Sequence, residues 1–166
     1  MIIDTLRFGQ LEVSEEQVFH FPMGILGFAS SKSFVIIDLE SQKPFKWMQC
    51  IDDPSTAFIL SDPLLIHPSY CAVVRRTELE PLGPLDELQE HDLVVSVILT
   101  ITDQSEDMSA NLCAPLIFNL ANRRGMQYVL NDRKYPVRYR IFQNDTKTAE
   151  MPVVSAVGES RALSLR

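Results

Sequence analysis

The sequence is poor in the features that mark metal-binding, secreted or membrane-spanning proteins. Its 166 residues hold 3 cysteines, Cys50, Cys71 and Cys113, and none of them forms a Cys-x-x-Cys pair of the kind that delivers zinc ligands. No apolar run reaches the roughly 18 residues that a membrane-spanning helix requires. The N-terminus, Met1-Ile2-Ile3-Asp4, shows no basic segment of a secretion signal. We therefore expect a cytoplasmic protein with inert thiols, no metal site and no membrane contact.

Sequence motifs of common catalytic machineries are also missing. The chain has no G-x-S-x-G nucleophile elbow, no glycine-rich phosphate loop and no His-Glu-x-x-His pair. Neighbouring carboxylates lie in turn-like segments, where a solvated surface is their ordinary state, and the three histidines are scattered. The residues make no positive case for an enzyme or a cofactor. A hydrolase would need a Ser or Cys, a His and an Asp that only the fold could bring together.

Short runs rich in Val, Ile, Phe, Tyr and Thr dominate what is present, and turn residues separate them. The segment 77–90 differs, because its leucines recur at a spacing of three while Pro81, Gly83 and Pro84 interrupt it. We expect short helices there, the second over 84–89. The pattern predicts an all-β protein, a small antiparallel β-barrel with one short helical insertion. The expected strands are 2–6, 17–21, 34–39, 45–51, 57–61, 70–75, 93–102, 115–120 and 126–130, with 93–102 at the centre.

Glycines and large apolar residues give further expectations. Gly24 and Gly27 should set the backbone shape of their loop, and Gly125 should be a hairpin glycine with positive φ. The large side chains expected in the core are those of Phe21, Trp47 and Phe58.

The length suits one domain with a core of its own. Beyond residue 142 the chain turns small and polar, with the Met-Pro-Val-Val stretch at 151–154 as its apolar cluster. We expect a β-barrel domain over 1–141 and a flexible tail over 142–166. A short docked helix over 156–165 is the alternative.

Charge is distributed unevenly along the chain. Residues 1–122 contain six Lys/Arg and 18 Asp/Glu, a net charge of −12, whereas residues 123–140 contain six Lys/Arg and one Asp, a net charge of +5. An acidic body repels phosphate backbones and favours a basic partner. The basic segment 123–140 is interpreted either as a solvated hairpin face or as a surface that binds RNA directly through its interleaved tyrosines.

Several segments, in this order and spacing, carry a family resemblance over residues 1 to about 141. They are Phe-Gly-Gln-Leu-Glu-Val at 8–13, Phe-Pro-Met-Gly-Ile-Leu-Gly-Phe at 21–28, Pro-Phe-Lys-Trp-Met-Gln at 44–49, Ala-Phe-Ile-Leu-Ser-Asp-Pro at 57–63, Met-Ser-Ala-Asn-Leu-Cys-Ala-Pro-Leu-Ile-Phe-Asn at 108–119 and Asn-Arg-Arg-Gly-Met-Gln at 122–127. Together they resemble the FliW family of flagellar assembly factors. The tail beyond 142 lies outside the resemblance.

The resemblance implies a small non-catalytic β-barrel with two protein partners. One is flagellin, which the factor would bind as a chaperone. The other is CsrA, the carbon storage regulator, a small basic dimer that represses translation of flagellin mRNA. Binding of CsrA would relieve this repression without direct contact with nucleic acid, and flagellin and CsrA would exclude each other.

The acidic loop at 103–109 lies next to the most specific of these segments, which makes it the expected partner-facing surface. The residues expected to face a partner are Glu106, Asp107, Met108 and Asn111, with Asn122, Arg123 and Arg124 nearby if the two hairpins are adjacent. The alternative is that Asn111, Asn119 and Asn122 only close turns and cap strands.

Overall fold

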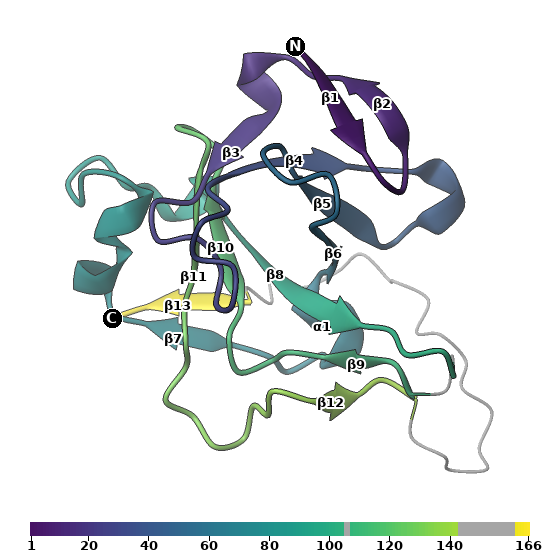
Figure 1. The fold of residues 1–166 in the computed structure, drawn as a ribbon. Coiled ribbons are helices and arrows are strands. Elements are labelled where there is room, and N and C mark those ends of the chain that lie inside the picture. Colours follow the sequence, from purple (N-terminus) through teal and green to yellow (C-terminus); the bar gives the residue numbers. More distant parts are fainter. Residues whose placement is uncertain (105–106, 143–161) are drawn as a thin grey trace.

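Short β-strands are the main regular elements of residues 1–104, 107–142 and 162–166, which the computed structural model describes (Figure 1). Seven of them form the barrel: β3 (Val18–His20), β4 (Ser33–Ile37), β5 (Lys46–Cys50), β6 (Ala57–Ser61), β8 (Leu93–Thr100), β10 (Leu116–Asn119) and β11 (Arg124–Gln127). The other strands are β1 (Ile2–Thr5), β2 (Gly9–Glu12), β7 (Ala72–Val74), β9 (Ser109–Ala110), β12 (Tyr139–Arg140) and β13 (Leu163–Leu165). The helical elements are α1 (Pro63–Ile66) and the 3₁₀ turns Glu15–Gln17, Glu40–Gln42, Arg76–Leu82 and Glu90–Asp92.

The barrel closes because β8 and β10 pair with each other at the two ends of the order β10-β11-β3-β4-β5-β6-β8. Neighbouring barrel strands are antiparallel except β11 and β3, which run parallel. The long strand β8 also pairs with β9, so it occupies the central position expected of the 93–102 run. The expected all-β barrel is confirmed.

Apolar residues fill the interior of this barrel. Phe21, Phe34 and Met48 are fully buried, and the rings of Phe21 and Phe34 meet edge to face at 5.2 Å. Trp47 on β5 is also buried, at 7% exposure, on the opposite side of the strand, where its indole Nε1 donates to Gln42 Oε1 at 2.5 Å. Of the three expected core residues, Phe21 and Trp47 are buried, and Phe58 is half-buried against the same cluster.

A second apolar cluster lies outside the barrel, under the segment that follows β7. Leu79, Leu82 and Leu88 are buried in it. Arg76 donates from its guanidinium to the carbonyl oxygens of Leu85 at 2.8 Å and Leu88 at 2.7 Å. The expected helix over 84–89 is wrong, because these carbonyls accept from an arginine and the segment forms a turn.

The last residues of the chain are ordered, which differs from the expected flexible tail. Residues 163–165 form β13 and pair in parallel with β7, although about ninety residues separate them in the sequence (Figure 1). Residues 162–166 are therefore neither a flexible tail nor the alternative helix. Ala162, Leu163 and Leu165 pack against the second cluster, which supplies the apolar contact that orders them. The remainder of the expected tail, 143–161, lies outside the described residues.

The predictions for Gly24 and Gly27 are confirmed, whereas the one for Gly125 is wrong. Gly24 and Gly27 have φ of +67° and +84°, as their loop requires. Gly125 does not have positive φ; the residue of that hairpin that does is Arg123, at 56°. Position 125 requires a glycine for another reason, since a Cβ there would overlap the ring of Phe21.

Candidate functional site: partner-binding surfaces

The residues expected to face a partner fall into two groups at opposite ends of β8. Asn119 pairs with Leu93 at the start of this strand, so the turn that holds Asn122 and Arg123 lies there. Asp107 and Met108 follow the end of the strand, near Thr100, and a strand of this length spans about 23 Å. The two hairpins are therefore not adjacent, so the condition for Asn122, Arg123 and Arg124 to lie near the acidic loop is not met.

The acidic loop keeps part of its expected character. Asp107 is exposed, and its backbone N–H donates to the carbonyl of Gln104 at 2.9 Å. Met108 is half-buried and packs against the second cluster, so it also supports the fold. Glu106 lies outside the described residues.

The three asparagines have structural partners. Asn111 accepts from the N–H of Ala114 at 3.0 Å. Asn119 and Asn122 both donate to the carbonyl of Leu82, at 3.1 and 2.6 Å, and accept from the N–H two residues onward. These bonds are those of turn closure, the alternative considered for them, and they tie the β10–β11 hairpin to the Arg76–Leu82 turn.

Arg123 and Arg124 are exposed but held by the same hairpin. The guanidinium of Arg123 lies over the Phe19 ring at 5.1 Å, and its carbonyl accepts from the N–H of His20 at 2.8 Å. Arg123 also borders a cavity of about 220 Å³ at the open end of the barrel. Arg124 donates to the carbonyl of Pro81 at 3.5 Å.

The geometry does not support the RNA-binding interpretation of 123–140. Base stacking needs exposed aromatic faces. Tyr135 is 2% exposed, and Tyr128 donates its hydroxyl to the Glu78 carboxylate. Tyr139 is half-buried, with its ring against His67 at 5.7 Å.

An acidic surface that the sequence analysis did not single out lies on the segment 77–92. This stretch contains six carboxylates and no Lys or Arg, and it forms the coils at one side of the molecule (Figure 1). The exposed carboxylates are those of Glu78, Glu80, Asp86, Glu87 and Glu90. The run of acidic residues could have predicted this surface, but the leucine spacing in the same segment predicts short helices and says nothing of a partner.

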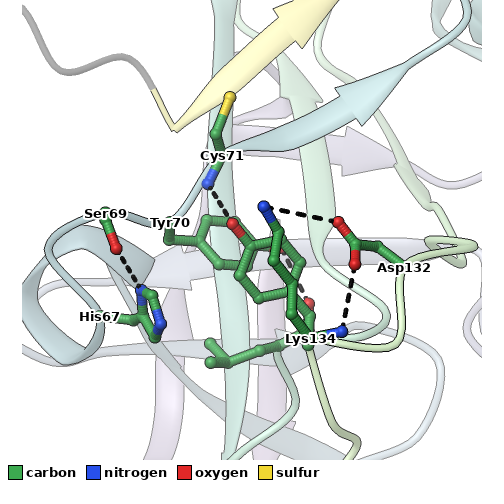
Figure 2. A network of polar contacts seen from close by, with 8 residues as sticks. His67, Ser69, Tyr70, Cys71, Asp132 and Lys134 are labelled. Atoms are coloured by element: carbon green, nitrogen blue, oxygen red, sulfur yellow. Dashed lines mark hydrogen bonds and ion pairs between the residues drawn. The ribbon is translucent and has the colours of Figure 1, made fainter.

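A groove between β7 and residues 128–132 was also missed. It has a volume of about 470 Å³ and is bordered by Cys71, Val73, Val129 and Arg166 among others. A polar network closes one end, where the backbone N–H of Cys71 donates to the hydroxyl of Tyr135 at 2.9 Å (Figure 2). Burial raises the pKa of the neighbouring Tyr70 phenol, whose hydroxyl donates to the carbonyl of Leu112 at 2.9 Å. No sequence signal marks this groove, because its two walls are about 55 residues apart in the chain.

Within the described part of the chain, no cluster of His, Cys, Asp and Glu has the arrangement of a metal site. All 3 cysteines are free thiols. None of the helices formed by those residues has the length and apolar character needed to cross a membrane.

Comparison with known proteins decides the family. The model of the family described as FliW protein matches residues 2–141. The chain belongs to the FliW family. The matched region contains both acidic surfaces and the barrel, and it ends before β13.

Named relatives agree with this FliW assignment. A flagellar assembly factor FliW of Syntrophus aciditrophicus is 38% identical over 144 residues, covering 87% of this chain and 89% of the relative. The flagellar assembly factor FliW of Caldicellulosiruptor saccharolyticus is 40% identical over 145 residues, covering 86% and 91%. A crystal structure of a flagellar assembly factor FliW superposes with a TM-score of 0.77 at 34% identity, covering 86% of this chain and 98% of that one. This FliW chain therefore belongs to a family of assembly factors and not of enzymes.

Proposed function

We propose that this flagellar assembly factor acts by binding proteins: it binds flagellin, and it binds CsrA and so relieves repression of flagellin mRNA translation. Membership of the FliW family supports the flagellar role. The distribution of charge supports a basic partner, and it is the observation on which the CsrA proposal depends.

A basic RNA-binding dimer is attracted to an acidic surface at long range. The net charge of −12 over residues 1–122 gives such a surface, and electrostatic complementarity raises association rate and selectivity more than affinity. An acidic protein bound beside an RNA-binding groove weakens phosphate binding by charge alone, so it need not cover the groove.

Two acidic surfaces are proposed to contact CsrA. One is the loop with Glu106 and Asp107, where Asp107 is exposed and has no cationic partner among the described residues. The other is the segment 77–92, where Glu80, Asp86 and Glu87 are exposed. The asparagine bonds that hold the β10–β11 hairpin end on the backbone carbonyl of Leu82 and involve no carboxylate of either surface, so the acidic side chains can be changed without breaking that hairpin.

Charge reversal tests this proposal. Calorimetry with purified CsrA would compare the loop variant Glu106→Lys/Asp107→Lys with the segment variant Asp86→Lys/Glu87→Lys. Each variant changes the net charge by four units, and at least one should weaken binding about tenfold near 150 mM salt. That loss should shrink toward 500 mM salt, because salt screens exposed charges.

The matched control is Glu15→Lys/Glu16→Lys, an exposed pair that belongs to neither proposed surface and gives the same change in net charge. Equal weakening by all three variants would show that only net charge acts and would contradict a defined contact. Wild-type protein that binds neither CsrA nor flagellin would overturn the proposed function, and flagellin that fails to displace CsrA would overturn mutual exclusion.

A further inference from the structure

Strand β7 has one paired edge and one open edge. On the paired edge the N–H of Ala72 donates to the carbonyl of Ala162 at 2.8 Å, and the carbonyl of Val74 accepts from the N–H of Arg166 at 2.9 Å. In a strand, backbone groups of successive residues point to alternate sides. The N–H and C=O of Cys71, Val73 and Arg75 therefore point away from β13, toward the groove of about 470 Å³.

Two tyrosines lie at the ends of this open edge. The hydroxyl of Tyr135 accepts from the N–H of Cys71 at 2.9 Å, and the hydroxyl of Tyr128, which also borders the groove, donates to the Glu78 carboxylate. Val73, between them, has no hydrogen-bond partner on this side among the described residues. Its backbone N–H and C=O are thus exposed strand-edge groups, which other strands pair with readily.

The far wall of the groove also has a backbone N–H and C=O without hydrogen-bond partners in the described part of the chain. The N–H groups of Tyr128 and Leu130 donate to the carbonyls of Pro115 at 2.9 Å and Cys113 at 2.7 Å. Val129, between them, directs its N–H and C=O the other way and has no partner among the described residues. Val129 and Val73 both border the groove of about 470 Å³ that separates the two walls.

We propose that this groove is a strand-addition site, in which an extended peptide of a partner protein pairs with Val73 on one side and Val129 on the other. Backbone hydrogen bonds would supply the affinity, as in other cases of strand addition to a sheet edge. The side chains of Val73 and Val129 are 41% and 56% exposed, and they would flank outward-facing β-branched residues of the peptide.

Charge at the two ends defines the peptide further. Arg75, Glu78 and Arg166 border the groove at the end where β7 finishes. Arg75 is paired with Glu78 at 4.0 Å, whereas the Arg166 guanidinium has no side-chain carboxylate partner among the described residues. At the other end the Asp132 carboxylate is engaged by the Lys134 ammonium at 3.7 Å and the Lys134 N–H at 3.1 Å (Figure 2). We therefore assign the peptide a carboxylate at the Arg166 end. In a peptide that runs parallel to β7, as β13 does, this carboxylate lies near the C-terminal end of the peptide.

Amide exchange of the full chain, followed by nuclear magnetic resonance, tests the open edge first. The N–H of Val73 should exchange much faster than those of Ala72 and Val74, which lie on either side of it on the same strand. Slow exchange at Val73 in the free protein would show that the edge is already paired and would overturn the proposal.

The second step adds the acetylated and amidated peptide Thr-Val-Thr-Val-Asp. It should shift the amide signals of Val73 and Val129 with a dissociation constant below about 1 mM. The same peptide with both valine nitrogens methylated should bind about tenfold more weakly, since it cannot donate to the edge. A peptide with Lys in place of Asp should also bind more weakly, because it faces Arg166.

Two variants locate the site. Val129→Pro removes one wall N–H and should weaken the peptide at least fivefold, whereas Val137→Pro, at a similarly exposed valine outside the groove, should leave binding unchanged. Saturating signal changes elsewhere, or none, or equal binding of the methylated peptide, would overturn the strand-addition site. None of these results bears on the binding of CsrA or flagellin, so the two proposals fail separately.

Discussion

At Gly125, steric contact with a neighbouring side chain, and not backbone conformation, determines which residue type the fold accepts. It lies within β11 with ordinary φ, and its missing Cβ makes room for the Phe21 ring in the barrel interior. The nearby residue with positive φ is Arg123, whose side chain lies on Phe19.

Substitution of Gly125 by Ala should therefore be strongly destabilising. The added methyl cannot be accommodated unless Phe21 leaves its packed position against Phe34 and Phe118, and overpacking of this kind costs about 1–3 kcal/mol. Urea unfolding followed by Trp47 fluorescence would measure the loss.

Gly27→Ala is the matched control, because φ there is +84° and a Cβ would meet nothing within 4 Å. Its cost should be limited to the backbone strain of about 1–2 kcal/mol. Gly125→Ala combined with a small residue at Phe21 should recover part of the loss. A Gly125→Ala protein as stable as wild type would contradict the packing explanation.

At the scale of elements, we predict that the packing of β13 contributes to the free energy of unfolding. Leu163 and Leu165 are half-buried against the second cluster, while Ser164 between them is exposed. The double variant Leu163→Ser/Leu165→Ser should lose about 2–3 kcal/mol of unfolding free energy through lost apolar burial. Ser164→Ala should change it by less than about 0.5 kcal/mol. Urea unfolding curves that are the same for the two variants would show that β13 does not hold β7 in solution.

The elements that the sequence predicted are those with a strong local pattern. The barrel strands were readable because runs such as 93–100 are long, apolar and β-branched. Strands β9 and β12 have only two residues each, and β13 exists only because β7 offers an edge to a distant segment. The same limit applies to the candidate site. The composition shows which segments are acidic, but only the register of the strands shows that Asp107 and Arg123 lie at opposite ends of β8.

For the whole molecule, the uneven charge has a cost in stability as well as a proposed use. The segment 77–92 concentrates six carboxylates without a Lys or Arg, and like charges this close repel one another. Arg124 is the basic side chain that reaches this segment from the barrel, and it contacts a carbonyl there and not a carboxylate. Arg75 pairs with Glu78 at 4.0 Å, and the Arg76 guanidinium donates to the carbonyls of Leu85 and Leu88, so part of the repulsion is offset within the chain. A basic partner would relieve the remainder.

Neutralising part of this segment should therefore raise stability while it lowers partner affinity. Asp86→Asn/Glu87→Gln should gain a few tenths of a kcal/mol in unfolding free energy at low salt, and the gain should vanish near 500 mM salt. The same variant should bind CsrA more weakly than wild type. Glu15→Gln/Glu16→Gln should show a smaller gain, because that stretch lacks the concentration of six carboxylates found in 77–92. A variant at Asp86 and Glu87 that gained stability and kept full CsrA affinity would remove this segment from the proposed contact and leave the loop at Glu106 and Asp107 as the remaining candidate.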